Sequence, residues 1–269
     1  MTLLHPFSRT NIPLPSINGL LTSRSEYTIK EIREHYIDQG ILSANPSDTS
    51  DYALVVVRHH FAMMSFWRPG DLNWTKINFK NDNLYNVVYF KGQFYVLTFD
   101  LEVWVFDIAE PIVKPRLLVH QLSRSNNSRK FYLVEVSGAL VIVTQSDYWK
   151  ASDDGHGYYY SIRTIEFNIY EVDEITGKLN EINTLGDSSI FLGRNGTTCI
   201  DSSRFTAGIK PTYIYFTNVY GPYGYMGAYN IKNGCIESLC PELELELSLG
   251  SNRLSTSWVT PSDNRRIKS

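Results

Sequence analysis

Two groups of residues in this sequence carry side chains that bind metals or transfer protons. His59-His60 joins two apolar segments, and Asp153-Asp154-Gly155-His156 combines carboxylates with an imidazole. Imidazole and carboxylate are ligands of zinc and calcium. Neighbouring residues of a strand point to opposite faces, however, so the two rings of the histidine pair should diverge. The acidic segment lacks the alternating oxygen ligands of an EF-hand. We therefore expect turn histidines and a solvated loop, with no metal site.

Paired carboxylates would be the chemistry of a glycosidase, in which two acids face one cavity about 5 to 10 Å apart. The acids to consider stand mostly in turns or at strand ends, where turn-forming or solvent-facing roles are typical; they are Asp71, Asp100, Glu102, Asp107, Glu135 and Asp173. Glu135 interrupts an apolar run, and strand alternation predicts an outward side chain there. The sequence has no GxSxG elbow, Walker loop or dinucleotide fingerprint. It therefore predicts neither an enzyme nor a bound cofactor.

The elements that would position these residues are short strands. A strand-turn-strand unit occurs twice, as NVVYFKGQFYVL from Asn86 to Leu97 and as FYLVEVSGALVIV from Phe131 to Val143. Its central glycines, Gly92 and Gly138, lie 46 residues apart (138 − 92). Repetition at this spacing, with β-branched and aromatic residues around a tight turn, is typical of β-propeller blades. We expect an all-β fold, a propeller of repeated antiparallel blades.

Further segments continue this pattern between turn residues. The predicted strands lie at residues 53–57, 61–67, 103–108, 165–173, 188–193 and 213–218, with a turn at Gly177 and a two-residue hairpin turn at Asn233-Gly234. We assign residues 117–143 to the third blade and interpret the polar, Tyr-rich stretch 147–160 as an insertion. Residues 27–37 fit a short helix or a strand equally well. The tract PELELELSLG, residues 241–250, alternates like a strand and could complete a blade or form an exposed edge.

Composition excludes several classes of partner. The 269 residues carry a formal net charge of −3, which provides no global field for nucleic acid or an anionic membrane. No apolar run approaches the length of about 18 to 20 residues that a membrane helix needs. Three cysteines, Cys199, Cys235 and Cys240, form no CxxC pair and no even set. We expect a soluble intracellular protein of the cytoplasm or nucleus, with an organelle as the alternative.

Aromatic residues gather in the segments that we interpret as loops. They include Tyr148, Trp149, Tyr158, Tyr159, Tyr220, Tyr223 and Tyr225. Tyrosine and tryptophan offer large rigid contact areas with a polar tip and dominate binding hot spots. Two interpretations remain open: these residues bind a partner protein, or they pack the loops onto the blades.

An ordered set of segments resembles the plant KIB-type β-propeller family. It comprises LLHPFSRTNIPLP, ILSANPSDTSDYALVVV, FWRPGDLNWTKI, VVYFKGQFYVL, LVEVSGALVIV, FNIYEVD, SIFLG, YIYFTN and SWVTPS. Members of that family commonly carry an N-terminal F-box, which docks on the Skp1-type adaptor of a ubiquitin ligase, and their propeller then binds the target protein. The resemblance implies a domain over residues 1–262 and a frayed tail over residues 263–269.

The chain opens directly at the segment Leu4-His5-Pro6-Phe7. We therefore expect a propeller without its first blade and without an F-box. The resemblance implies a substrate-recognition domain for an unknown target protein, with a Skp1-type adaptor as partner only if an F-box is encoded upstream. The alternatives are a stand-alone interaction scaffold with no ligase role and, less in keeping with the residues, a carbohydrate-acting enzyme.

Overall fold

The computed structural model of the chain describes residues 2–4, 11–16, 20, 37–58, 63–79, 84–109, 113–120, 128–153, 158–193, 196–205, 208–220 and 223–239. These residues form strands almost throughout, which confirms the expected all-β class. They belong to two compact units. Unit 1 comprises Met1–Ser123 and Glu174–Lys178, and unit 2 comprises Arg124–Asp173 and Leu179–Ser269.

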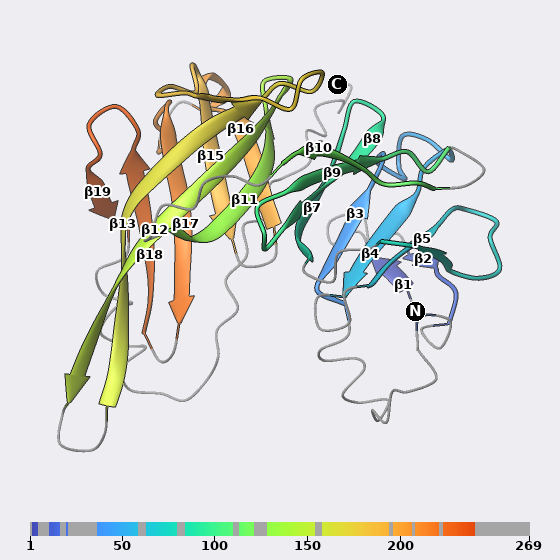
Figure 1. Cartoon of the computed structure of the whole chain (residues 1–269), viewed down its shortest axis with the longest axis horizontal. Coiled ribbons are helices and arrows are strands. Elements are labelled where there is room, and N and C mark those ends of the chain that lie inside the picture. Colours follow the sequence, from blue (N-terminus) through green and yellow to red (C-terminus); the bar gives the residue numbers. More distant parts are fainter. Residues whose placement is uncertain are drawn as a thin grey trace, which may run out of the picture. The chain divides into compact units, whose positions relative to one another are not determined.

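Unit 1 holds two four-stranded antiparallel sheets in which each strand pairs with the next one along the chain (Figure 1). The first sheet contains β3 (Gln39–Leu42), β4 (Leu54–Arg58), β5 (Met63–Trp67) and β6 (Thr75–Ile77). The second contains β7 (Leu84–Phe90), β8 (Gln93–Thr98), β9 (Val103–Phe106) and β10 (Arg116–Val119). A small sheet pairs β1 (Thr2–Leu4) with β2 (Asn11–Pro13). This meander is how a propeller blade is built.

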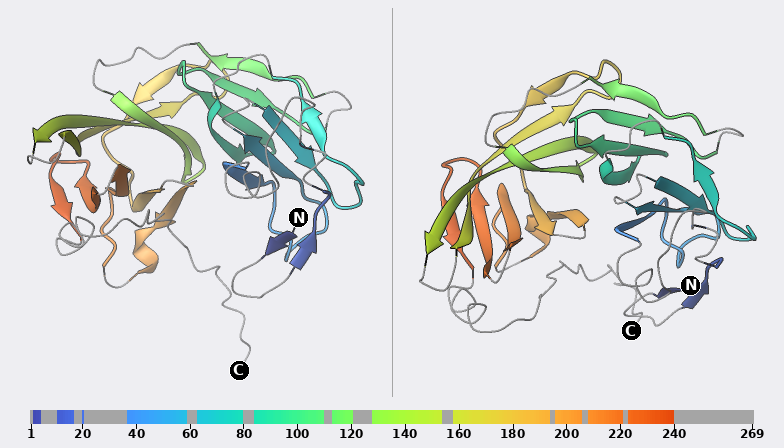
Figure 2. Two further views of the ribbon diagram at one scale, coloured as in Figure 1. Left: turned by 90° about the horizontal axis from the view of Figure 1, so that it is seen from below. Right: turned by 60° about the horizontal axis from the view of Figure 1, so that its bottom comes forward.

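Unit 2 holds the third and fourth large sheets (Figure 2). The third contains β11 (Ser128–Val136), β12 (Ala139–Asp153), β13 (Tyr158–Val172) and β14 (Leu179–Glu181). The fourth has the order β16-β15-β17-β18-β19, formed by β15 (Ser188–Gly193), β16 (Gly196–Asp201), β17 (Tyr213–Tyr220), β18 (Tyr223–Asn230) and β19 (Ile236–Ser238). The 3-10 helix η3 (Ser202–Arg204) follows β16. β15 and β17 pair in parallel.

The repeated unit seen in the sequence forms two matching hairpins. The turn from β7 to β8 places Lys91 at φ 45° and Gly92 at φ 85°, and the turn from β11 to β12 places Ser137 at φ 50° and Gly138 at φ 83°. Two consecutive residues with positive φ are the mark of a type I′ turn, whose twist suits a hairpin. The repeat in the sequence is therefore also a repeat in the structure.

Each unit has its own apolar core. In unit 1, Phe94 of β8 stacks on Phe106 of β9 with 5.4 Å between ring centroids. The buried side chains around this pair come from β4 to β9 and include Val55, Met64, Val87 and Val96. In unit 2, the core combines side chains from the third and fourth sheets. Its members include Val141, Val143, Phe167, Ile190 and Phe216. Burial of these apolar faces is the main stabilising term for such sheets.

Three details differ from the expectations. Residues 117–119 belong to β10 of the second sheet, so the third sheet begins at Ser128. The stretch 147–160 is strand on both sides of residues 154–157, because its tyrosines are good strand formers that continue β12 and β13. The hairpin at Asn233-Gly234 exists, but Asn230 donates to the carbonyl of Cys235 (2.9 Å), so its loop has four residues. Residues 27–36, 241–250 and 263–269 lie outside the described residues.

Candidate functional site

The aromatic residues predicted to bind a partner lie in two hairpins of unit 2. Tyr148 and Trp149 are in β12, where they pair with Arg163 and Ile162 of β13. Tyr158 and Tyr159 begin β13 and pair with Asp153 and Ser152. The expectation that these residues sit in loops was wrong, because paired strands carry them. The prediction that they bind a partner stays a prediction.

The second aromatic group lies in the hairpin of β17 and β18. Tyr220 pairs with Tyr223 at the end of this hairpin, and Tyr225 pairs with Asn218. The turn ends of the β12–β13 and β17–β18 hairpins lie at the same end of unit 2, in both Figure 1 and Figure 2. β13 also contacts β17. The structure thus places two aromatic segments, about 70 residues apart in the sequence, at one end of unit 2.

Of the aromatic residues predicted to bind a partner, Tyr148 has a side chain whose exposure the structure describes, and it is accessible to solvent. Tyr148 is 58% exposed, although its neighbour Asp147 in the same strand is buried. An exposed large aromatic side chain held on a paired strand needs little additional ordering when it enters an interface. Tyr148 is therefore the residue of this group for which the geometry already fits a binding role.

A polar cluster, buried except for the half-buried Tyr132, lies next to Tyr148 and was not anticipated from the sequence. Its members are Tyr132, Gln145, Asp147 and Thr164, with Lys130 beside them. The Gln145 amide donates to Oδ1 of Asp147 (2.8 Å) and to Oγ1 of Thr164 (2.9 Å), and the Thr164 hydroxyl donates to Oδ1 of Asp147 (3.0 Å). The Tyr132 hydroxyl donates to Oε1 of Gln145 (3.0 Å). We call this set the polar cluster.

Lys130 provides the positive charge of the polar cluster. Its Nζ lies 3.9 Å from Oδ2 of Asp147, and both side chains are largely buried. Burial lowers the pKa of Lys130 from its ordinary 10.5 to about 8, and the Asp147 carboxylate opposes this change. Desolvation therefore outweighs the ion pair, as is usual for buried charges. In sequence, Gln145 and Asp147 look like the start of a polar loop, which is why pattern reasoning missed them.

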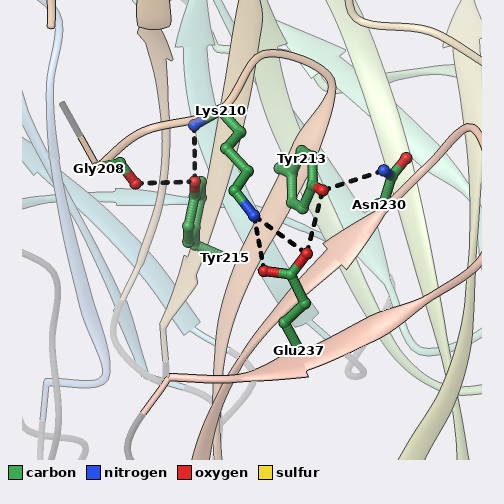
Figure 3. Close-up of polar contacts among 6 residues, drawn as sticks. All are labelled: Gly208, Lys210, Tyr213, Tyr215, Asn230 and Glu237. Atoms are coloured by element: carbon green, nitrogen blue, oxygen red, sulfur yellow. Dashed lines mark hydrogen bonds and ion pairs between the residues drawn. The ribbon is translucent and has the colours of Figure 1, made fainter. Parts of the chain in front are cut away.

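A second polar network ties the fourth sheet together (Figure 3). Lys210 Nζ lies 2.7 Å and 3.0 Å from the two carboxylate oxygens of Glu237 in β19. The Tyr213 hydroxyl donates to Glu237 (3.3 Å) and accepts from Asn230 (3.0 Å). The hydrogen bond to Glu237 raises the pKa of Lys210, and the same bond lowers the pKa of Glu237. Lys210 and Glu237 are exposed and paired with each other, so we assign this ion pair to surface structure.

The same network also holds the segment from Gly208 to Lys210 against the aromatic rings of the fourth sheet. The Tyr215 hydroxyl accepts from the Lys210 backbone N–H (2.8 Å) and donates to the Gly208 carbonyl (3.3 Å). Its ring stacks on Phe191 with 4.7 Å between centroids. The segment around Lys210 therefore closes over this face of the fourth sheet.

The acids considered for catalysis serve turns where their contacts are described. Asp71 accepts from the Arg68 N–H (3.0 Å), Asp107 from the Ala109 N–H (2.8 Å) and Glu135 from the Gly138 N–H (2.8 Å). Glu102 accepts from the Trp104 indole (2.9 Å). Glu135 is exposed, which confirms its outward orientation. These are structural roles that local hydrogen bonding explains.

The remaining candidates for metal binding or catalysis can be judged only within the described residues. His59-His60 and residues 154–157 lie outside the described residues. Within the described part of the chain, no group of three or more histidine, cysteine, aspartate or glutamate side chains is placed to hold a metal ion. Burial raises the pKa of the Cys199 thiol, which disfavours the reactive thiolate. Within the described residues, none of the helical segments has the length and apolar composition of a membrane span.

Successive antiparallel four-stranded sheets with matching type I′ hairpins define the class of protein: it is a β-propeller domain. Residues 1–230 match the KIB1-4 beta-propeller family, and the chain belongs to that family. The resemblance noted from the sequence is thereby confirmed.

Relatives of this chain are F-box proteins by name. It is 24% identical over 229 residues to the Probable F-box protein At1g65740 of Arabidopsis thaliana, covering 80% of this chain and 60% of the relative. It is 24% identical over 238 residues to the F-box protein At2g26160 of the same plant, covering 79% and 70%. The F-box/kelch-repeat protein At1g64840 is 21% identical over 209 residues, covering 75% and 50%. The chain thus spans 60% of the length of the first of these relatives.

Among solved structures, a chain of PorZ matches over 71% of this chain and 26% of its own length. PorZ is described as a bacterial surface component of the type-IX secretion system of Porphyromonas gingivalis. The identity is 13% and the TM-score is 0.32, so this likeness carries no argument about function.

Proposed function

We propose that this chain is a protein-binding β-propeller that recognises the target of a plant F-box-type ubiquitin ligase and performs no catalysis itself. The observation that supports it best is the placement of two Tyr-rich hairpins at one end of unit 2, with Tyr148 of β12 58% exposed. The names of the relatives support the ligase context.

Hairpins suit this role better than loops would. Each immobilised loop side chain costs part of the binding free energy, whereas paired strands are ordered before the partner arrives. Tyrosine and tryptophan then contribute large contact areas through few rotatable bonds. On this proposal the two hairpins form the central contact and the partner is a folded or extended protein segment.

The first experiment compares tagged wild-type chain with Tyr148→Ala/Trp149→Ala in plant cell extracts, followed by affinity measurement with each purified partner. A partner that uses this surface should bind the variant about 30-fold more weakly, the effect of losing one hot-spot residue of about 2 kcal/mol. Leu72→Ala is the matched control, because Leu72 is 88% exposed and lies in unit 1. Equal binding by the wild type, the variant and the control would contradict the proposed surface.

The second experiment separates the ligase role from a stand-alone scaffold. The chain and a version extended with any upstream coding sequence are purified from plant cells and examined for a Skp1-type adaptor and cullin. Recovery of the adaptor with the extended form supports the recognition domain of a ligase. Failure of both forms to recover it, with the hairpin partner still bound, supports the scaffold.

A further inference from the structure

The hairpin that carries Tyr148 and Trp149 extends beyond its sheet. β11 makes its last pair at Ser128 with Ser146, and β14 pairs with β13 only over Tyr170–Val172. Among the described strands, residues 148–153 and 158–163 pair only with each other, and we call them the ribbon. A two-stranded hairpin is marginally stable alone, and a slip of one residue turns every side chain to the other face. Something at its base must therefore fix the pairing.

The pairing changes at the base of the ribbon. Ser146 pairs with Glu166, but the next residue, Asp147, pairs with Thr164, so Ile165 is the extra residue of a β-bulge. This register buries Thr164, which is 5% exposed, and leaves Ile165 48% exposed. Hydrophobic preference alone would select the opposite arrangement.

The polar cluster explains that choice. Only with Thr164 opposite Asp147 does the Thr164 hydroxyl reach Oδ1 of Asp147 (3.0 Å) while accepting from Gln145 (2.9 Å). In the unbulged register Ile165 would face the buried carboxylate, and both hydrogen bonds of the Thr164 hydroxyl would be lost. Leaving a buried polar group without its partner is costly, whereas exposing one isoleucine costs less.

From these contacts we infer that the polar cluster is a register-setting device: Gln145, Asp147 and Thr164 select the bulged pairing and thereby position Tyr148 and Trp149. Buried polar groups are known to specify register in other proteins even where they add no stability. The consequence for binding rests on the function proposed above. The consequence for the ribbon does not.

The test replaces Lys130 and the three register-setting residues of the polar cluster by apolar residues, in the variant Lys130→Leu/Gln145→Leu/Asp147→Leu/Thr164→Val. Global stability should be kept or raised, because well-packed apolar residues often replace buried charges without loss. Backbone amides of residues 148–153 and 158–163 should nevertheless exchange with solvent at least about tenfold faster, as expected when a hydrogen-bonded support is removed. Hydrogen exchange with fragment-resolved mass spectrometry measures the ribbon and the rest of unit 2 in one sample.

Three comparisons make the result specific. Thr144→Val removes a buried hydroxyl from β12 outside the polar cluster and should leave ribbon exchange unchanged. Amides of the β17–β18 hairpin should keep wild-type exchange in every variant. Asp147→Asn, which retains an oxygen acceptor for Gln145 and Thr164, should keep most of the ribbon protection of the wild type. Thr164→Val alone serves if the fourfold variant does not fold.

Ribbon exchange that stays at the wild-type rate in the apolar variants would overturn the inference. So would acceleration spread evenly over unit 2, because that outcome indicates a general stabilising role. Faster ribbon exchange with unchanged partner affinity supports the register device and counts against the binding surface proposed above. Faster exchange with weakened binding supports both.

Discussion

The second and third sheets begin with the same strand-turn-strand unit and then diverge. β8 ends at Thr98, where the Leu101 N–H donates to the Thr98 carbonyl (3.0 Å) and the chain turns back into β9. At the corresponding place, 46 residues later (144 − 98), β12 passes Thr144 and continues to Asp153. Buried Leu101 stands where the third sheet has Asp147. One blade therefore closes over an apolar turn, while the other uses a polar cluster to extend into the ribbon.

The hairpin that the second and third sheets share should be equally important for stability in both sheets. Substitutions in its buried positions should therefore give the largest loss of stability. Phe94 and Leu140 occupy corresponding positions 46 residues apart (140 − 94), and both side chains are fully buried. Phe94→Ala should lower the free energy of unfolding by about 3 to 5 kcal/mol and Leu140→Ala by about 2 to 5 kcal/mol, through lost contacts and a cavity. Urea unfolding measures both. A loss below about 1 kcal/mol at either position would break the correspondence.

In the third sheet, Lys130 should make the free energy of unfolding depend on pH. Lys130 corresponds to buried Leu84 of the second sheet (130 − 84 = 46), and its folded-state pKa of about 8 lies below the ordinary 10.5. Between these values the unfolded chain binds more protons, so stability rises with pH across the window. From pH 7.5 to 9.5, wild type should gain about 1 to 2 kcal/mol relative to Lys130→Leu.

Urea unfolding at the two pH values measures this gain. The window stops at 9.5 because burial raises the pKa values of Tyr95, Tyr170 and Tyr229 above the ordinary value of 10.0, and these groups affect stability at higher pH. Parallel pH profiles for the wild type and the variant would show that Lys130 keeps its ordinary pKa.

The two type I′ turns should give the smallest and most nearly equal effects. Gly92 and Gly138 have φ of 85° and 83°, and a Cβ on either would meet no atom within 4 Å. Alanine should cost about 1 kcal/mol at each, from backbone conformation alone. Gly196→Ala is the matched control, because Gly196 has the same free space without a positive φ. Thermal unfolding measures the loss of stability in each alanine variant. Two losses that differ by much more than about 1 kcal/mol would contradict the equivalence of the two turns.

Local residue chemistry explains which parts of this fold were predictable. The Gly92 and Gly138 turns and the apolar strands beside them are short-range signals, and their hairpins were predicted where the structure has them. The assignment of residues 117–119 failed because the choice between two neighbouring sheets depends on long-range pairing with β9. The family, too, was recognisable from the order of its segments.

The candidate site was predictable only in part. Tyr148, Trp149, Tyr158 and Tyr159 were singled out for their side chains, but the polar residues around them suggested a loop. Their high strand propensity was the signal that could have indicated the ribbon. Nothing local indicates that Gln145, Asp147 and Thr164 meet, because Thr164 lies 19 residues from Gln145 and reaches it only through the bulged register.

The parallel pairing of β15 with β17 has a consequence for the time course of folding. Hairpins such as β11–β12 and β12–β13 join neighbouring segments and close short loops, whereas Ile190 meets Ile214 only after β16 and η3 have been passed over. Loop closure must then precede any gain from contacts, which makes such pairing slow. The hydrogen bonds of the fourth sheet should therefore form after those of the third sheet. Pulse-labelled amides of β17 should gain protection later than those of β12, and the aromatic face of Tyr215 and Phe191 should leave water later than the buried side chains of β12.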